Sequence, residues 1–256
     1  MLIKPFSYLQ QKVVSAPSGI VTTDLLNYYD ATSPMPNPGG NPIPDLQGNM
    51  DASMYGTTAI TTVGGVTAFN IPGNSSSWIG TGSSPTGQTG ININNGITLE
   101  IWGYFTAFQS QDWFYNLYNL GSGGTQRQMF RNELTIAGYS TGNSGGDHYD
   151  RYLNNADVTT LPRTISLNTW THYVMTYSPG NFGIYLNTSY SGNTVFTAPT
   201  TYFGVGRNLY LWLARRDDRA TDNVPMAVGE WRFYNKALSQ LEVNQNWNAT
   251  KARYGY

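Results

Sequence analysis

Residues Ile97–Phe105 (ITLEIWGYF) are the stretch of sequence that decides the fold. Successive side chains of a β-strand point to opposite faces, so this stretch predicts a strand with two distinct faces. One face is apolar and consists of Ile97, Leu99, Ile101 and Phe105. The other face is mainly aromatic and consists of Glu100, Trp102 and Tyr104. We therefore expect a strand that is covered on both sides or that faces a concave surface.

A hairpin and several further strands are expected around this stretch. Trp170–Tyr177 and Phe182–Asn187 have strand composition and flank a Ser-Pro-Gly-Asn turn, which predicts an antiparallel pair. Other short strands are expected at Leu25–Tyr29, Gln128–Glu133, Leu209–Ala214 and Val228–Asn235. Many short strands separated by turn residues indicate an all-β sandwich or barrel.

Two long stretches are predicted to be loops. Ser33–Pro44 is rich in proline and glycine, and proline cannot donate a backbone hydrogen bond to a sheet. Asn74–Gly90 is dense in serine, glycine and threonine. Long loops in compact domains often carry function.

One short helix is predicted near the C-terminus. Ser239 is a good N-cap, and Glu242 three residues later completes a capping box. Leu238 and Val243 stand at the positions of a hydrophobic staple. The helix is expected to end by Lys251 and to clip onto the sandwich without a chemical role.

Composition narrows the classes of function. The 256 residues include 28 glycines, 13 prolines and only 11% charged residues, against about 25% in an average protein. The formal net charge is −1 and the 14 lysines and arginines are scattered, so we expect no nucleic-acid partner. No apolar run approaches the roughly 20 residues that span a bilayer, so we expect no membrane insertion. The chain has no cysteine, which fits folding in a reducing cytoplasm.

Three segments in order carry a family resemblance: Leu25–Gly56, the strand Ile97–Phe105 followed by the hairpin Trp170–Asn187, and Gly229–Gly255. Through them the sequence resembles the concanavalin A-like, laminin G-like domains of tailed-phage structural proteins, marine and cyanobacterial phages especially. The match is imperfect at Gln47 and Met50, where family members often have serine and glycine. The resemblance implies a jelly-roll sandwich of two antiparallel sheets over residues 25–256, with a short C-terminal helix. Residues 1–24 would form an extended N-terminal arm.

The same resemblance implies a function. We expect a non-enzymatic phage virion protein, namely a capsid decoration subunit, a head fibre or a tail accessory subunit. It would dock onto other virion proteins through its arm and loops, as a homo-oligomer or in many copies, after assembly in the host cytoplasm. The alternative is a carbohydrate-binding module that recognises a host-surface glycan during attachment.

The sequence contains no recognisable catalytic motif. Glycan-cleaving relatives of the fold need two carboxylates across the scissile bond, and the Glu-x-Asp-x-x-Glu pattern of one such family is missing. Glu230 shares a strand face with Arg232, which predicts a salt bridge. His172 lies mid-strand and is expected to be packed or hydrogen-bonded. We expect no catalytic residue and no cofactor.

The remaining candidates are binding residues. Asp112–Tyr118 is rich in aromatic residues that could contact a sugar or another protein, with a core strand as the alternative. The stretch 145–150 is predicted to be a polar loop, and it adds a histidine and a tyrosine. The candidate contact residues are Trp113, Tyr115, Tyr118, His148 and Tyr149. Calcium is the best metal guess, with weak candidate ligands at Asp217, Asp218 and Asp222, but neighbouring arginines compete for these carboxylates.

Overall fold

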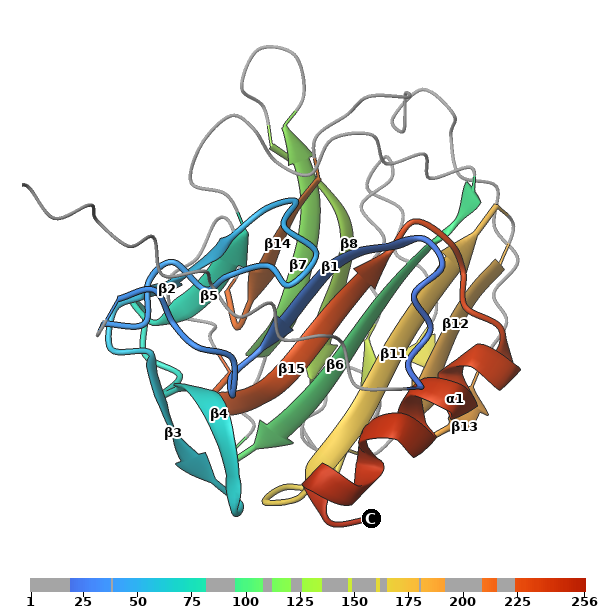
Figure 1. Ribbon diagram of the computed structural model, residues 1–256. Helices are drawn as coiled ribbons and strands as arrows, with labels where there is room; N and C mark the ends of the chain where they lie inside the picture. Colours follow the sequence, from blue (N-terminus) through green and yellow to red (C-terminus); the bar gives the residue numbers. More distant parts are fainter. Residues whose placement is uncertain are drawn as a thin grey trace, which may run out of the picture.

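Figure 1 shows the computed structural model of the 256-residue chain. The described residues are 19–37, 39–81, 95–107, 112–120, 126–134, 147–148, 160–161, 165–179, 181–191, 209–215 and 224–256. They form two antiparallel sheets and one α-helix, as the resemblance predicted. The predicted fold class is therefore confirmed.

Sheet A contains the strands that the sequence marks most clearly. Its order is β13-β12-β11-β6-β15-β4-β3, and β1 pairs with β15 beyond the end of β4. The bounds are β1 Leu25–Asp30, β3 Ala59–Val63, β4 Val66–Ile71, β6 Ile97–Phe105, β11 Trp170–Ser178, β12 Asn181–Leu186, β13 Ser189–Ser191 and β15 Met226–Tyr234. The first strand pairs with the last, so the two ends of the domain lie together.

Sheet B packs against sheet A with the order β10-β9-β8-β7-β14-β5-β2. The bounds are β2 Ala52–Tyr55, β5 Trp78–Thr81, β7 Asp112–Leu120, β8 Gln126–Leu134, β9 Asp147–His148, β10 Thr160–Leu161 and β14 Leu209–Leu213. Strand β5 corrects the prediction that all of Asn74–Gly90 is a loop. Its four residues pair with both β2 and β14, which overrides the weak strand signal of its Ser- and Gly-rich surroundings.

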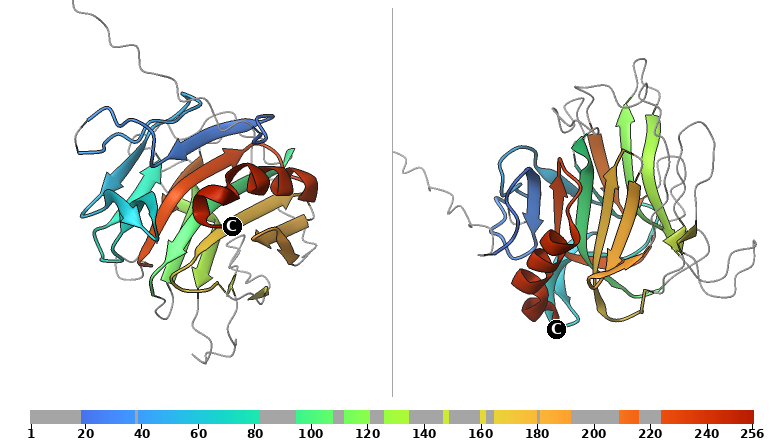
Figure 2. Two further views of the ribbon diagram at one scale, coloured as in Figure 1. Left: turned by 60° about the horizontal axis from the view of Figure 1, so that its bottom comes forward. Right: turned by 90° about the vertical axis from the view of Figure 1, so that its right-hand side faces the viewer.

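The main core lies between the two sheets. The predicted apolar face of β6 belongs to it, since Ile97, Leu99, Ile101 and Phe105 are all fully buried there. The opposite face of β6 is buried as well, because the C-terminal helix crosses the outer side of sheet A (Figure 2). The expectation of a strand covered on both sides is therefore confirmed.

The helix α1 spans Gln240–Thr250 and is followed by a 3₁₀ helix at Lys251–Tyr254. It begins with the predicted capping box of Ser239 and Glu242. Two smaller apolar clusters lie beneath it on the outer face of sheet A, one around Val243 and Tyr234 and one around Trp102. The molecule thus has three layers, namely sheet B, sheet A and the helix.

The first described residues pack under this helix. Ile20 and Val21 are buried, and the Val21 amide donates to Asn246 Oδ1 at 2.7 Å. Gln245 Nε2 also donates to the Gly19 carbonyl at 2.8 Å. The predicted division between an arm and a domain at residue 24 stays a prediction, but residues 19–21 contact the helix.

Candidate functional site

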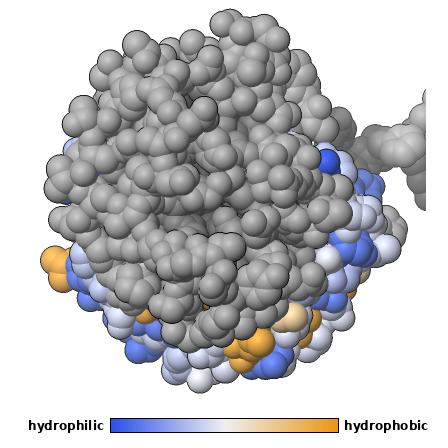
Figure 3. All heavy atoms as spheres, turned by 180° about the vertical axis from the view of Figure 1, so that it is seen from behind, coloured by the Kyte–Doolittle hydropathy of each residue, from blue (hydrophilic) through white to orange (hydrophobic). Residues whose placement is uncertain are grey.

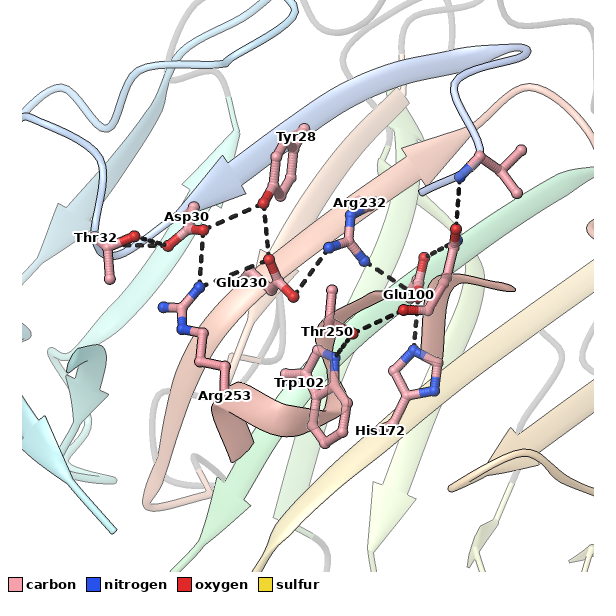
Figure 4. A network of polar contacts seen from close by, with 12 residues as sticks. Tyr28, Asp30, Thr32, Glu100, Trp102, His172, Glu230, Arg232, Thr250 and Arg253 are labelled. Carbon is pink, nitrogen blue, oxygen red and sulfur yellow. Dashed lines mark hydrogen bonds and ion pairs between the residues drawn. The ribbon is translucent and has the colours of Figure 1, made fainter. Parts of the chain in front are cut away.

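A group of ionisable side chains lies between sheet A and the helix, and we call it the ion network (Figure 4). It draws residues from β1, β6, β11, β15 and the 3₁₀ helix, whose side chains point away from the main core. Its ionisable members are Asp30, Glu100, His172, Glu230, Arg232 and Arg253. Glu100, His172, Glu230 and Arg232 are at most 1% exposed.

Arg232 sits between two carboxylates. Its guanidinium nitrogens lie 3.2 Å from Glu100 Oε1 and 2.9 Å from Glu230 Oε1. The N–H bonds are not aligned with these oxygens, so the contacts are ion pairs rather than linear hydrogen bonds. The predicted salt bridge between Glu230 and Arg232 is therefore present. The register places Arg232 opposite Glu100 across β15 and β6, which explains the second contact.

Glu100 is held from several sides. His172 Nε2 lies 2.6 Å from its Oε1, and Asn246 Nδ2 donates to its Oε2 at 2.7 Å. Burial alone would raise the pKa of Glu100, but Arg232, His172 and Asn246 together lower it to about 2. His172 is therefore a buried, hydrogen-bonded residue, as the sequence predicted.

The far end of the network joins the C-terminus to the first strand. Tyr28 donates to Glu230 Oε2 at 2.8 Å, and Arg253 donates to Asp30 Oδ2 at 2.8 Å. Burial and the Glu230 carboxylate raise the pKa of Tyr28, so its hydroxyl stays a donor. Trp102 Nε1 donates to Thr250 Oγ1 at 2.9 Å, while the Trp102 ring stacks on Tyr254.

This arrangement is suited to holding the helix on the sheet. Glycoside hydrolysis needs two carboxylates that flank a substrate, one of which carries a proton. Glu100 and Glu230 are both buried and share one guanidinium, and the low pKa of Glu100 keeps it ionised. As placed here, neither carboxylate can reach a glycan.

A second group of side chains lies on the outer face of sheet B. We call it the aromatic–arginine cluster, and its members are Tyr55, Trp78, Trp212 and Arg215. The rings of Tyr55 and Trp78 stack with centroids 3.8 Å apart, and Trp212 meets Trp78 edge-on at 5.2 Å. The Arg215 guanidinium lies over both indole rings. All four residues are half-buried, so this cluster, unlike the ion network, reaches the surface.

The sequence-predicted contact residues have different outcomes. Tyr115 is fully buried between the sheets against Phe114 and Tyr173, so it is a core residue rather than a surface contact. Trp113 and Tyr118 lie on the same strand, β7, but their side chains are outside the described part of the structure. Tyr149 lies outside it entirely. His148 belongs to the short strand β9, which corrects the prediction of a loop at that position.

The structure does not test the calcium prediction. Asp217, Asp218 and Asp222 lie outside the described residues. Among the residues that are described, no three His, Cys, Asp or Glu side chains gather as metal ligands. In the same part of the chain, no helix is both long and apolar enough to cross a membrane.

The sequence did not predict that either of these two sets of side chains would come together. Glu100, His172 and Arg232 each stand mid-strand, but only the strand order brings them together. Trp78 was predicted to lie in a loop, and Trp212 in a strand whose neighbouring strands were not predicted. The ion network could have been suspected from ionisable residues that stand in the middle of strands between apolar neighbours.

Comparison with known proteins identifies the sequence family. Residues 67–244 match the sequence model described as the Concanavalin A-like lectin/glucanases superfamily, which covers more than half of the chain. The matched range includes both β6 and the Glu230–Arg232 pair. No curated protein matches the sequence.

Solved structures share the fold at low identity. Trypanosoma rangeli sialidase in complex with sialic acid is 12% identical with a TM-score of 0.62, over 93% of this chain and 35% of the sialidase. The binding domain of botulinum neurotoxin DC in complex with rat synaptotagmin II is 12% identical with a TM-score of 0.61, over 88% of this chain and 51% of the toxin chain. The chain thus spans about a third and about a half of these proteins, and the likeness shows the fold alone.

Proposed function

Because the chain belongs to the concanavalin A-like lectin/glucanases superfamily, we propose that it is a non-enzymatic binding domain on the surface of a tailed-phage particle. A fold hosts many functions, so the proposal depends on the chain's own residues. The proposal that the chain is not an enzyme is supported by the way the outer face of sheet A is covered. The helix covers that face, and the carboxylates beneath it are committed to Arg232 and His172.

The phage setting is supported by the sequence resemblance, which is strongest at the C-terminal end. The Asn248–Gly255 tail, typical of the phage proteins, supplies Thr250 and Arg253 to the polar contacts on sheet A. Arg253 reaches Asp30 on the first strand, so the tail ties the two ends of the domain together. A partner can then be contacted by the N-terminal arm and the loops without disturbing the sandwich.

Labelling of intact particles tests this role. Antibody raised against the purified chain should bind the outside of particles of the phage that encodes it. Deleting residues 1–18 should release the protein from particles while its circular dichroism spectrum stays that of a folded β protein. Absence of the chain from purified particles would overturn the virion role. Glycan hydrolysis by the purified chain, lost on changing a carboxylate, would overturn the non-enzymatic part.

A second candidate function is carbohydrate binding for host attachment. The aromatic–arginine cluster favours it, since aromatic side chains with a polar neighbour are typical of binding surfaces. A glycan array with the purified chain tests this function. Signal on no glycan at all would remove it and leave protein docking as the role.

A further inference from the structure

The aromatic–arginine cluster is built by cross-strand pairing on sheet B. Tyr55 on β2 is the direct pair of Trp78 on β5, and Trp212 on β14 is the pair of Gly80. Side chains alternate along a strand, so Trp78 and Gly80 share a face. The intervening residues Met54, Ile79, Leu211 and Leu213 belong to the main core. The aromatic rings therefore stand on the opposite, outer face of the sheet.

Gly80 provides the floor of the cluster. A Cβ at this position would collide with the Trp78 ring and would lie 3.0 Å from Trp212. Without that atom, both indole rings can lie against the backbone of β5. The rings are thus held in place by the sheet itself, which is what a site formed before its ligand arrives requires.

Arg215 is the charged member of the cluster and is fixed by the rings. Its guanidinium carbon lies 4.5 Å from the Trp78 ring centroid and 5.1 Å from that of Trp212, distances typical of cation–π contacts. Tyr55 in turn stacks on the Trp78 ring. The two indole rings thus contact the guanidinium, whose N–H donors lie in its plane and can meet an acceptor.

That acceptor is missing from the described residues. The Arg215 Nε atom is buried and makes no hydrogen bond. A partly buried guanidinium that lacks an acceptor is incompletely solvated, so an anionic group that meets its accessible N–H donors gains more than it would at a fully exposed arginine. The aromatic surface around the guanidinium adds apolar contact area to this single charge.

We propose that the aromatic–arginine cluster binds an acidic saccharide. Its carboxylate or sulfate would meet the Arg215 edge, and the apolar C–H face of the sugar ring would lie against Trp212 or Tyr55. An inorganic anion would leave the aromatic surface unused, and a neutral sugar would leave the Arg215 charge without a counter-charge. The proposal deepens the carbohydrate-binding function given above as the second candidate and rests on it.

Titration calorimetry of the full chain with defined probes tests the site. The acidic probes are 3′-sialyllactose, tetragalacturonic acid and a heparin tetrasaccharide, which separate carboxylate from sulfate recognition. The neutral probes are lactose and a galactose tetrasaccharide. We expect at least one acidic probe to bind ten-fold or more tightly than its neutral counterpart, and Arg215→Gln to remove that difference. Arg215→Lys should restore it in part, because it keeps the charge but not the planar donors.

Matched controls keep the outcome specific. Tyr190→Ala removes a 43% exposed aromatic side chain from sheet A, and Lys251→Gln removes a positive charge beside the helix. Both should leave binding unchanged, whereas Trp212→Ala should weaken binding of acidic and neutral probes alike. Each variant is compared only if its circular dichroism spectrum matches the parent; if Trp212→Ala fails this check, the arginine variants decide.

The outcomes separate this inference from the functions on which it rests. Glycan binding that ignores acidic groups and survives Arg215→Gln would overturn the site while leaving carbohydrate binding in place. Binding of none of the probes, in an array as well as by calorimetry, would overturn both. Binding of a virion protein that Arg215→Gln abolishes, without any saccharide binding, would reassign the cluster to a partner's acidic side chain and overturn the inference.

Discussion

Arg232 is a buried charge whose partners come from two strands and whose role is structural. Its contacts with Glu100 and Glu230 balance one guanidinium against two carboxylates. Burial disfavours the charged form of Arg232, but Glu230 and Glu100 raise its pKa well above the ordinary value. Removing one member of such a group costs about 3–5 kcal/mol, because the others stay buried without a partner. The network therefore ties correct packing of the helix to correct pairing of β6 and β15.

The low pKa of Glu100 predicts an acid-sensitive contribution to stability. Its folded-state pKa of about 2 lies below the ordinary value of 4.5, so the contribution is complete above pH 4.5 and is lost as the pH falls toward 2. A shift of this size corresponds to a free energy on the order of 3 kcal/mol. Glu100→Gln should be less stable than the parent at pH 7, and its unfolding free energy should depend less on pH between 5 and 2.

Urea unfolding at pH 7, 5, 4 and 3 measures this effect. Asp24→Asn, which removes an exposed carboxylate, serves as the control and should keep the parent's pH dependence. Parallel pH profiles for Glu100→Gln and the parent would contradict the role of this carboxylate.

Asp45 is a residue whose role the sequence marks only through a resemblance. The segment around it matches a family element, but the reason is visible only in the structure. Its carboxylate accepts hydrogen bonds from the side chain of Asn27 and from the backbone amides of Tyr28, Gln47, Asn49 and Met50. Asparagine or aspartate side chains that bind nearby amides are a known way to fix a turn. Here one carboxylate also anchors the loop to β1.

At the scale of elements, strand β6 and its two faces could be predicted from the sequence, but the packing of the helix on its second face could not. The alternation of Leu99 and Ile101 with Glu100 and Trp102 sets the two faces. Nothing in that alternation says whether the second face meets solvent, a glycan or a helix. The answer depends on α1, which lies more than a hundred residues away in sequence and crosses the sheet (Figure 2). The same distance explains why the ion network was predicted only as one salt bridge.

Strand β5, in contrast, was itself not predicted from the sequence. Its residues Trp78–Thr81 are too few, and too close to serine and glycine, to stand out as a strand. Pairing on both edges, with β2 and with β14, stabilises it. Because Trp78 was read as a loop residue, the aromatic–arginine cluster could not be predicted from the sequence.

The capping box of α1 was predicted from sequence alone and leads to a prediction about stability. The Ser239 side chain accepts from the Glu242 amide, and Glu242 accepts from the Ser239 amide. Ser239→Ala removes one of these bonds and should lower the unfolding free energy by about 1 kcal/mol. Leu241→Ala changes a residue of the same helix that is 80% exposed, and it should stay within about 0.5 kcal/mol of the parent.

Thermal and urea unfolding of these two variants provide the measurement. Equal losses from Ser239→Ala and Leu241→Ala would show that the cap does not contribute to the stability of the folded chain.

At the scale of the whole molecule, the three layers leave few apolar groups at the described surface. The exposed large hydrophobic residues are Leu167, Tyr190, Leu241 and Tyr256, which lie on separate elements. Of the atoms that Figure 3 colours, most are hydrophilic, with isolated hydrophobic ones among them. Single exposed apolar residues are normal for a protein surface. The described part of the surface therefore presents no broad apolar interface.

Ile20 and Val21 pack beneath the C-terminal helix, and this packing limits the extent of the proposed arm. Ile20 and Val21 pack in one apolar cluster with Tyr234 and Val243, and the Val21 amide satisfies the buried Asn246. A domain that started after these residues would leave this cluster open and Asn246 Oδ1 without its donor. The docking arm that we propose would therefore have to end before residue 19.

Replacing these two residues in the full chain tests that boundary. The double variant Ile20→Ala with Val21→Ala keeps the backbone bond to Asn246 but empties part of the cluster, and we expect it to lose about 3 kcal/mol of unfolding free energy. Thr23→Ala, at an exposed position two residues further on, should lose less than about 0.5 kcal/mol. A double variant as stable as the parent would mean that residues 19–21 belong energetically to the arm. In that case the contacts of Asn246, Thr250 and Arg253 with sheet A would hold the helix in place without them.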